Sequence, residues 1–155
     1  MKDKKNTVCL VASSGGHLTQ LLYLENAWKG LDCFYVTTSN SARATLIPKG
    51  KCYIVTEASR NHPLTLLRVI YQSFNIFVRE KPQIILSTGS GTGCLLCLLG
   101  KILFRCKVIW VDSIANTQIL SLSGRIARYF ADICLTQWPS VANKYKNVRF
   151  AGAVL

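Results

Sequence analysis

Residues 7–17 read TVCLVASSGGH, an apolar run that passes directly into a polar, glycine-rich turn. The run from Thr7 to Ser13 is rich in valine and leucine, which is typical of a strand buried on both faces of a sheet. Apolar residues then recur at helical spacing from Leu18 to Lys29, and Gly30 ends that helix. A strand, a tight turn and a helix in this order indicate an α/β fold.

The same alternation continues to the end of the chain. Residues 38–51, which include Pro48 and Gly50, are predicted to be mostly loop. Strands that alternate with helices, each strand a continuous apolar run, predict a Rossmann-like parallel sheet with helices on both faces. The length of 155 residues suits a single domain over residues 1–155. We expect further strands at Cys33–Thr37, Cys52–Val55, Gln83–Ser87, Lys107–Val111, Ile133–Thr136 and near Val148–Phe150, and further helices at Pro63 to about Arg79, Thr92–Phe104 and about Ser123–Phe130.

The chain is strongly basic, with 19 lysines and arginines against 7 acidic residues and a net charge of +12. Such an excess indicates polyanionic partners. Nucleic acid is disfavoured, because no recognition helix and no stacking aromatic residues are evident. The basic residues lie instead beside apolar helical faces, which suits an anionic membrane surface, although a scattered solvated shell is the alternative. We expect the membrane-facing residues to include Arg68, Phe74, Phe77, Lys101 and Arg105.

The most apolar stretch, from Gly91 to Phe104, is shorter than the roughly 18–20 residues that span a bilayer. We therefore expect peripheral attachment. The seven cysteines are odd in number and lie in apolar runs, so we expect reduced, buried thiols. Cys94 and Cys97 form a CxxC with no second pair, which disfavours zinc and redox chemistry. No metal and no cofactor are expected.

Two glycine-rich turns follow predicted strands. In an open α/β sheet, ligands bind beyond the carboxyl ends of the strands. The first turn is Ser13, Ser14, Gly15 and Gly16, and the second is Thr88, Gly89, Ser90 and Gly91; both open into helices. Free amides and the helix dipole favour a phosphate or diphosphate there, and the alternative is a tight turn with solvated serines. Neither turn matches the GxxxxGK[ST] or GxGxxG patterns, so a nucleoside triphosphatase is disfavoured.

Two residues next to these turns are candidates for proton transfer. His17 is one of two histidines, and a helix N-terminus favours the neutral imidazole that accepts a proton. Asp112 follows the predicted strand at Lys107–Val111 and precedes Ser113. A capping role for Asp112 is equally compatible with this position.

Three segments resemble a known family: SSGGHLTQLL, STGSGTG, and DSIANTQILSLSGRIARYFADICLTQWP from Asp112 to Pro139. They are similar to the bacterial PssD- and CpsF-type polysaccharide glycosyltransferase subunits. Their eukaryotic relative is the membrane-anchor subunit of the two-chain UDP-N-acetylglucosamine transferase. The resemblance implies the N-terminal half of a MurG-like GT-B glycosyltransferase, with a separate donor-binding chain as partner. The N-terminal transmembrane helix of the eukaryotic anchor is not recognisable, so peripheral attachment to the cytoplasmic face of the cell membrane is expected.

The resemblance also implies a reaction. The chain is expected to be the acceptor-binding subunit of an inverting glycosyltransferase that uses a UDP-sugar in exopolysaccharide or capsule repeat-unit synthesis. The two turns and Ser113 would bind a polyprenyl-diphosphate-linked acceptor. His17 would act as base, Asp112 would orient it or act itself, and the partner chain is a further possible source of the base. The alternatives are a non-catalytic recruiting subunit and a small nucleotide-binding domain that acts on soluble substrates.

Overall fold

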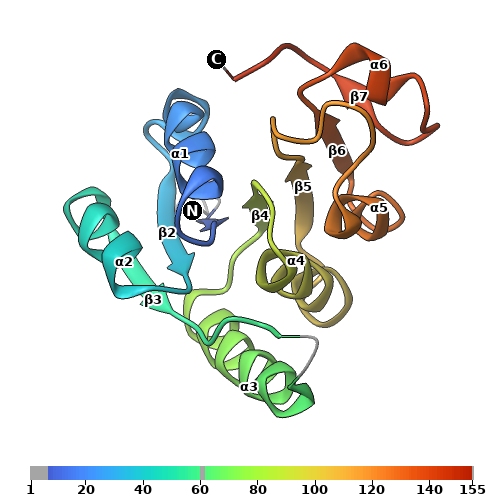
Figure 1. The fold of residues 1–155 in the computed structure, drawn as a ribbon. Coiled ribbons are helices and arrows are strands. Elements are labelled where there is room, and N and C mark those ends of the chain that lie inside the picture. Colours follow the sequence, from blue (N-terminus) through green and yellow to red (C-terminus); the bar gives the residue numbers. More distant parts are fainter. Residues whose placement is uncertain (1–6, 60–61, 155) are drawn as a thin grey trace, which may run out of the picture.

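The computed structural model describes residues 7–59 and 62–154, and its strands form one parallel sheet (Figure 1). The strand order is β3-β2-β1-β4-β5-β6-β7. The strands β2 and β3 are added on one side of β1, and β4 to β7 on the other. The strand order therefore reverses between β1 and β4, which is the topological switch point of doubly wound folds. The strands are β1 (Thr7–Val11), β2 (Asp32–Thr37), β3 (Lys51–Ile54), β4 (Ile84–Ser87), β5 (Lys107–Val111), β6 (Ile133–Thr136) and β7 (Arg149–Phe150).

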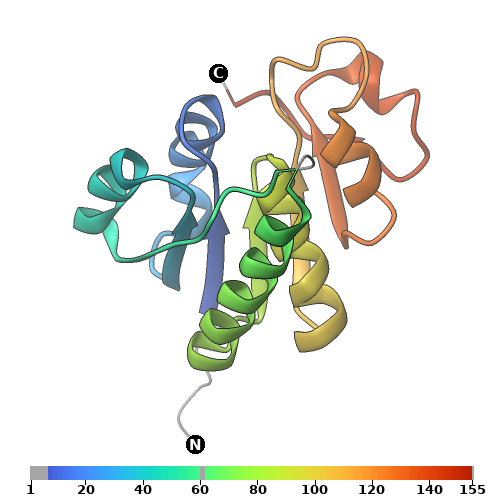
Figure 2. The same cartoon turned by 60° about the horizontal axis from the view of Figure 1, so that its bottom comes forward.

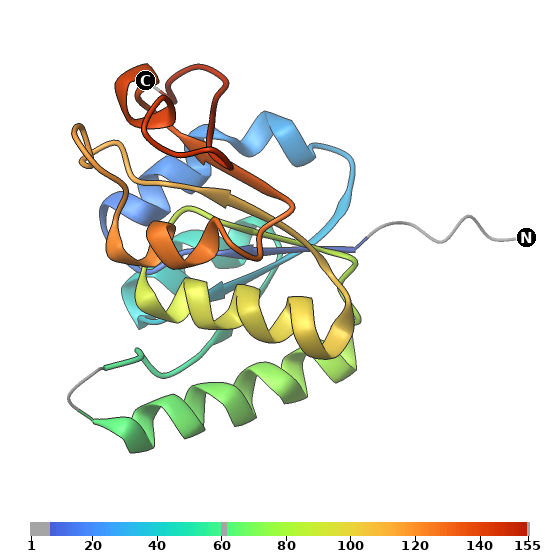
Figure 3. The same cartoon turned by 90° about the vertical axis from the view of Figure 1, so that its right-hand side faces the viewer.

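Helices cover both faces of the sheet (Figure 3). One layer holds α1, α2 and two short 3₁₀ turns, and the other holds α3, α4 and α5. Figure 2 shows α3 and α4 side by side in front of the sheet. The predicted Rossmann-like fold is thus confirmed. The helical elements are α1 (Gly16–Tyr23), η1 (Glu25–Trp28), α2 (Asn40–Leu46), η2 (Ile47–Lys49), α3 (Pro63–Glu80), α4 (Gly91–Phe104), α5 (Leu122–Ala127) and α6 (Pro139–Ala142).

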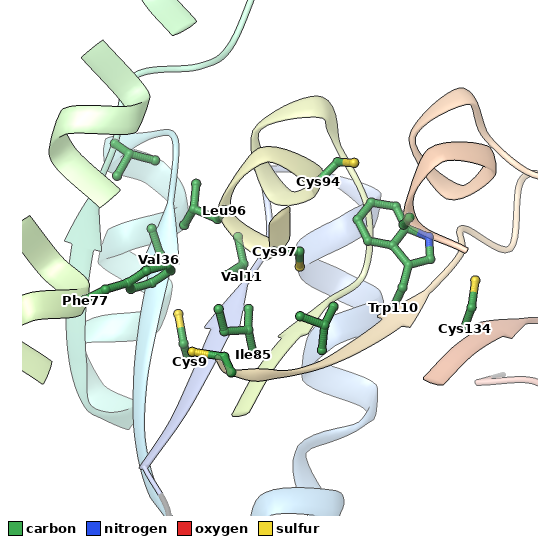
Figure 4. Close-up of a cluster of buried hydrophobic side chains, with 14 of the residues drawn as sticks. Cys9, Val11, Val36, Phe77, Ile85, Cys94, Leu96, Cys97, Trp110 and Cys134 are labelled. Carbon is green, nitrogen blue, oxygen red and sulfur yellow. The ribbon is translucent and has the colours of Figure 1, made fainter. Parts of the chain in front are cut away.

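Alternate residues of each strand fill two separate apolar layers. On the α1 side, Leu10 and Tyr35 pack with Leu21 and Trp28. The larger layer lies on the α3–α5 side (Figure 4), where the sheet meets three helices. Its members include Val11, Val36, Phe77, Ile85, Leu96, Cys97 and Trp110. Burial of the sheet on both faces explains why the central strands are continuous apolar runs.

The segment predicted as loop, residues 38–51, contains α2 and η2 instead. The Ser39 hydroxyl caps α2 by accepting a hydrogen bond from the Ala42 amide at 3.2 Å. Only Ala42 and Leu46 of this helix are buried. Two buried positions make too short an apolar pattern to reveal a helix, which explains the wrong prediction.

Two further boundaries differ from the prediction. The helix expected to Lys29 ends at Tyr23 and continues as η1, because the Leu24 amide donates to the Leu21 carbonyl in a tighter turn. The short helix α6 was not predicted. It begins at Pro139, which is favoured at the first position of a helix.

All seven cysteines are free thiols. Five are buried as predicted, whereas Cys33 and Cys52 are half-buried. Burial raises the pKa of Cys94 and Cys106 to about 11. These thiols are therefore protonated near neutral pH and behave as small apolar side chains.

Candidate functional site

The turn between β1 and α1 lies at the carboxyl edge of the sheet. Ser13 is buried, whereas Ser14, Gly15 and Gly16 are exposed. Gly15 has φ 82°, in the left-handed region that favours glycine, and it forms the N-cap of α1. No side chain of the described residues caps this helix. The backbone amides in the first turn of α1 therefore donate to no capping side chain and can donate to an anion instead.

The turn between β4 and α4 is held by its own hydrogen bonds. The Ser87 hydroxyl donates to the Gly89 carbonyl at 3.2 Å and accepts from the Gly89 amide at 3.3 Å. The Ser90 hydroxyl caps α4 by accepting from the Gly93 amide at 3.0 Å. Thr88 is fully buried, and only Gly91 of the predicted binding residues here is exposed. Most of this turn is thus buried and holds the neighbouring surface residues in position.

His17 joins the two turns. Its Nδ1 lies 2.9 Å from the Thr88 carbonyl oxygen, and the Thr88 hydroxyl donates to the His17 carbonyl at 2.6 Å. Because a carbonyl oxygen only accepts, the proton of the neutral ring lies on Nδ1. The lone pair is then on Nε2, which is the form required of a base.

Gly89 gives the His17 ring the space it occupies. A Cβ atom at Gly89 would lie 2.3 Å from His17 Cε1 and 2.4 Å from Nδ1. Gly89 also has φ 138°, a conformation that L side chains rarely adopt. Both the contact and the backbone conformation therefore require glycine beside the imidazole.

Asp112 lies at the carboxyl end of β5 and is fully buried. Its carboxylate accepts from the Ser121 hydroxyl at 2.5 Å, the Ser121 amide at 2.8 Å, Trp110 Nε1 at 3.2 Å and Asn116 Nδ2 at 3.3 Å. Within residues 7–59 and 62–154, no hydrogen bond joins it to His17. These contacts fix the loop between β5 and α5, whereas the side chain that caps α5 is Ser121.

The loop that Asp112 organises leads into α5. A Cβ atom at Gly124 would lie 2.5 Å from Asp112 Oδ1, so the helix approaches the carboxylate closely. The Ser121 hydroxyl accepts from the Gly124 amide at 2.8 Å and caps α5. Ser113 is half-buried, and its hydroxyl accepts from the Ala115 amide at 3.3 Å.

Phe77 was wrongly predicted to face the membrane. It is fully buried and shares the inner face of α3 with Val69 and Ser73, which lie eight and four residues earlier. Its ring packs edge-on against Phe104, with centroids 5.5 Å apart. Apolar residues surround most of α3, so sequence periodicity did not separate the inner face from the outer one.

The other predicted membrane-facing residues lie at or near the surface. Arg68 and Arg105 are exposed, and Phe74 is 45% exposed. Lys101 is half-buried and forms an ion pair with Asp132 at 2.8 Å. Within the part of the chain that the structure describes, no helix is long and apolar enough to cross a membrane.

Solved structures with the same arrangement place the chain in a fold class, the N-terminal domains of GT-B glycosyltransferases. MurG of Acinetobacter baumannii superposes with a TM-score of 0.72 at 13% identity, over 88% of this chain and 43% of that one. A UDP-GlcNAc 2-epimerase of Neisseria meningitidis gives a TM-score of 0.71 at 11% identity, over 96% of this chain and 47% of that one. The chain spans less than half the length of either protein.

Residues 8–154 match the family described as "Oligosaccharide biosynthesis protein Alg14 like", and the chain belongs to this family. The "UDP-N-acetylglucosamine transferase subunit alg14" of Schizosaccharomyces pombe is 44% identical over 91% of this chain and 80% of its own length. The human protein of that name is 27% identical over 96% of this chain and 83% of its own. The predicted glycosyltransferase subunit is confirmed, whereas the bacterial PssD or CpsF identity stays a prediction.

The contact between Gly89 and His17 yields a first prediction. Gly89→Ala should displace the imidazole, because the new methyl group would overlap the ring. The imidazole signals of His17 in a histidine NMR spectrum should shift, while those of His62 stay in place. Gly16→Ala is the matched control, since its Cβ meets nothing within 4 Å. Unchanged His17 signals in Gly89→Ala would contradict this packing.

The buried carboxylate yields a second prediction. Asp112→Asn should lower the free energy of unfolding by about 1–3 kcal/mol, because an amide nitrogen would face donors that now meet a carboxylate oxygen. Asp32→Asn is the control: Asp32 is exposed and accepts only from the Thr7 hydroxyl at 3.2 Å among the described contacts. We expect Asp32→Asn to change the free energy of unfolding, measured by urea denaturation, by no more than about 0.5 kcal/mol. Equal stability of the two variants would remove the organising role of Asp112.

Proposed function

We propose that this chain binds a lipid-linked, diphosphate-containing acceptor and, with a separate donor-binding chain, forms an inverting glycosyltransferase. The observation that carries the proposal is the meeting of two glycine-rich turns at His17, whose Nε2 is free to accept a proton. The relatives are named as subunits of a UDP-N-acetylglucosamine transferase, which supports UDP-N-acetylglucosamine as the donor.

The names of the relatives support a separate partner chain. The chain matches 43% of MurG and so corresponds to about half of such an enzyme. The word "subunit" in the names of the relatives supports another polypeptide. We assign the donor sugar and the departing UDP to that partner.

The proposed reaction begins with the acceptor diphosphate against the exposed amides of Ser14, Gly15 and Gly16. His17 Nε2 takes the proton of the acceptor hydroxyl as its oxygen attacks the anomeric carbon of the donor. The bond from that carbon to UDP breaks, and the configuration inverts. The Nδ1 proton stays on the ring and is donated in a hydrogen bond to the Thr88 carbonyl, which stabilises the imidazolium that forms. The reaction so written uses no cofactor.

The contacts of the two candidate bases favour His17 over Asp112. Each Asp112 oxygen already accepts two hydrogen bonds, and the side chain is fully buried. His17 is only partly buried, and one ring nitrogen has no partner among the described residues. Asp112 instead positions the loop that follows β5.

We further propose that α3 and α4 contact an anionic membrane at its cytoplasmic face. Five exposed apolar residues recur every three or four positions on α3 and therefore form one outer stripe. Exposed Arg68, Arg79, Lys81 and Arg105 lie on or beside α3 and α4. Cations beside an apolar surface suit acidic lipid headgroups. The outer stripe consists of Leu64, Leu67, Tyr71, Phe74 and Val78.

The lipid-linked product would serve capsule or exopolysaccharide repeat-unit synthesis, as the resemblance to the bacterial subunits predicts. The description of the matched family supports the wider class, oligosaccharide biosynthesis. The proposed substrates, a nucleotide sugar and a lipid-linked acceptor, suit both capsule or exopolysaccharide synthesis and the wider class of oligosaccharide biosynthesis.

His17→Ala should lower the kcat of the two-chain enzyme by about 100- to 10,000-fold, because the general base is lost. The assay is sugar transfer in detergent by the chain reconstituted with its donor-binding partner. His62→Ala is the matched control, since His62 is exposed and is the only other histidine. Full activity of His17→Ala in an assembled complex would favour the alternative, a non-catalytic recruiting subunit.

The double variant Leu64→Glu, Leu67→Glu should bind anionic vesicles at least about tenfold more weakly, because two apolar contacts are replaced by repelled charges. Both residues are more than half exposed, at 77% and 63%, so folding should be retained. The control is Leu31→Glu, Ile47→Glu, which carries the same charges at exposed positions elsewhere on the surface. Sedimentation with phosphatidylserine vesicles measures both, and equal retention of the two variants would contradict the assigned face.

A further inference from the structure

An apolar groove opens beside the turn between β4 and α4. Its volume is about 380 Å³, within the range of small-molecule pockets. The walls come from three helices: Leu66 from α3, Leu95 and Leu98 from α4, and Ile126 from α5. Gly91, the exposed first residue of α4, also lines the groove. None of the described residues that line this groove carries a charge.

We propose that this groove holds the isoprene units of the acceptor that lie next to its diphosphate. The inference rests on the proposed function, which places the diphosphate at the first glycine-rich turn. Gly91 belongs both to the second turn, which His17 joins to the first, and to the groove, so the groove adjoins the proposed diphosphate site. A ligand that uses both must join a phosphate directly to hydrocarbon, which is the chemistry of a polyprenyl diphosphate.

The groove leads toward the proposed membrane surface. Leu98 is followed one turn later on α4 by Ile102, which is 65% exposed, and Leu66 is followed on α3 by Leu67 of the outer stripe. The helices α3 and α4 lie side by side (Figure 3). Phe74 of α3 packs against Phe104 of α4, with ring centroids 5.5 Å apart. A hydrocarbon chain that starts at Gly91 can therefore pass between protein walls before it enters lipid.

The one ionisable side chain in the lining is kept neutral. Burial raises the pKa of the Cys94 thiol to about 11, and its Sγ donates to the Ser123 carbonyl at 3.7 Å. The segment that closes one side is anchored by the Ala58 amide, which donates to the Thr92 hydroxyl at 2.8 Å. An uncharged lining in which apolar side chains predominate suits hydrocarbon.

The first test is photo-crosslinking with the intact chain. The probe is a farnesyl diphosphate analogue with a diazirine on the isoprene unit next to the diphosphate. We expect the label on peptides that contain Leu95, Leu98 or Ile126, with competition by unlabelled farnesyl diphosphate but not by inorganic diphosphate. Label confined to the outer stripe of α3, or equal competition by inorganic diphosphate, would overturn the inference.

The second test is the chain-length dependence of transfer by the two-chain enzyme. The acceptors carry one sugar on diphosphates with one, two or four isoprene units, all below their micelle concentrations. We expect kcat/KM to rise by about tenfold or more from one unit to the length that fills the groove. In Ile126→Glu this rise should disappear, whereas Ile133→Glu, at a comparable exposure on β6, should keep it.

The outcomes separate this inference from the proposed function. Two results would contradict the proposed isoprene site without affecting the proposed transferase function. One is transfer that is independent of chain length in the wild type, and the other is transfer that depends equally on chain length in Ile126→Glu and Ile133→Glu. Labelling of the groove without transfer to any acceptor overturns the transferase and supports a polyprenyl-diphosphate site. Leu98→Gln, which is uncharged and at a half-buried position, replaces Ile126→Glu if that variant fails to fold.

Discussion

The site depends on one constraint, the parallel pairing of β1 with β4. Val8 to Val11 lie beside Ile84 to Ser87 in register, so the turns that follow these strands emerge next to each other. His17 then reaches Thr88, a residue 71 positions away, through two hydrogen bonds. The pairing places His17, the helix N-termini and the groove at one edge of the sheet. The residues between these strands in sequence form α1, β2, α2, β3 and α3.

The chemistry of the site depends on which polar groups already form hydrogen bonds within the protein and which do not. Buried Thr88 and Asp112 both have their polar atoms engaged within the protein, so each fixes a neighbouring segment. Among the described residues, the backbone amides of the first turn and one imidazole nitrogen have no hydrogen-bond partner within the protein. Fixed amides stabilise negative charge without having to reorganise when it develops. This arrangement suits an anionic acceptor and a single proton transfer.

Local patterns in the sequence account for the elements but not for the contacts between them. Sequence patterns predicted the strand at residues 7–11 and the long helix from Pro63, because each has a long apolar pattern and a residue that marks where it begins or ends. The helix α2 was missed because only Ala42 and Leu46 are buried. Phe77 was misplaced because α3 has apolar residues on both its inner and outer faces. The hydrogen bond from His17 to Thr88 has no local signal at all, since it depends on strand order.

The two faces of α3 would allow one helix to serve both folding and the proposed membrane contact. Its inner residues, among them Val69 and Phe77, are fully buried against the sheet, whereas the outer stripe stays exposed. An exposed apolar stripe costs stability in water unless another apolar phase covers it. In the proposed function, membrane lipid supplies such a phase, and the groove between α3, α4 and α5 opens beside it. A substrate anchored in that lipid would then present its diphosphate to the turns without its hydrocarbon chain crossing water, so the proposed acceptor site and the proposed membrane surface would need to lie on the same half of the enzyme.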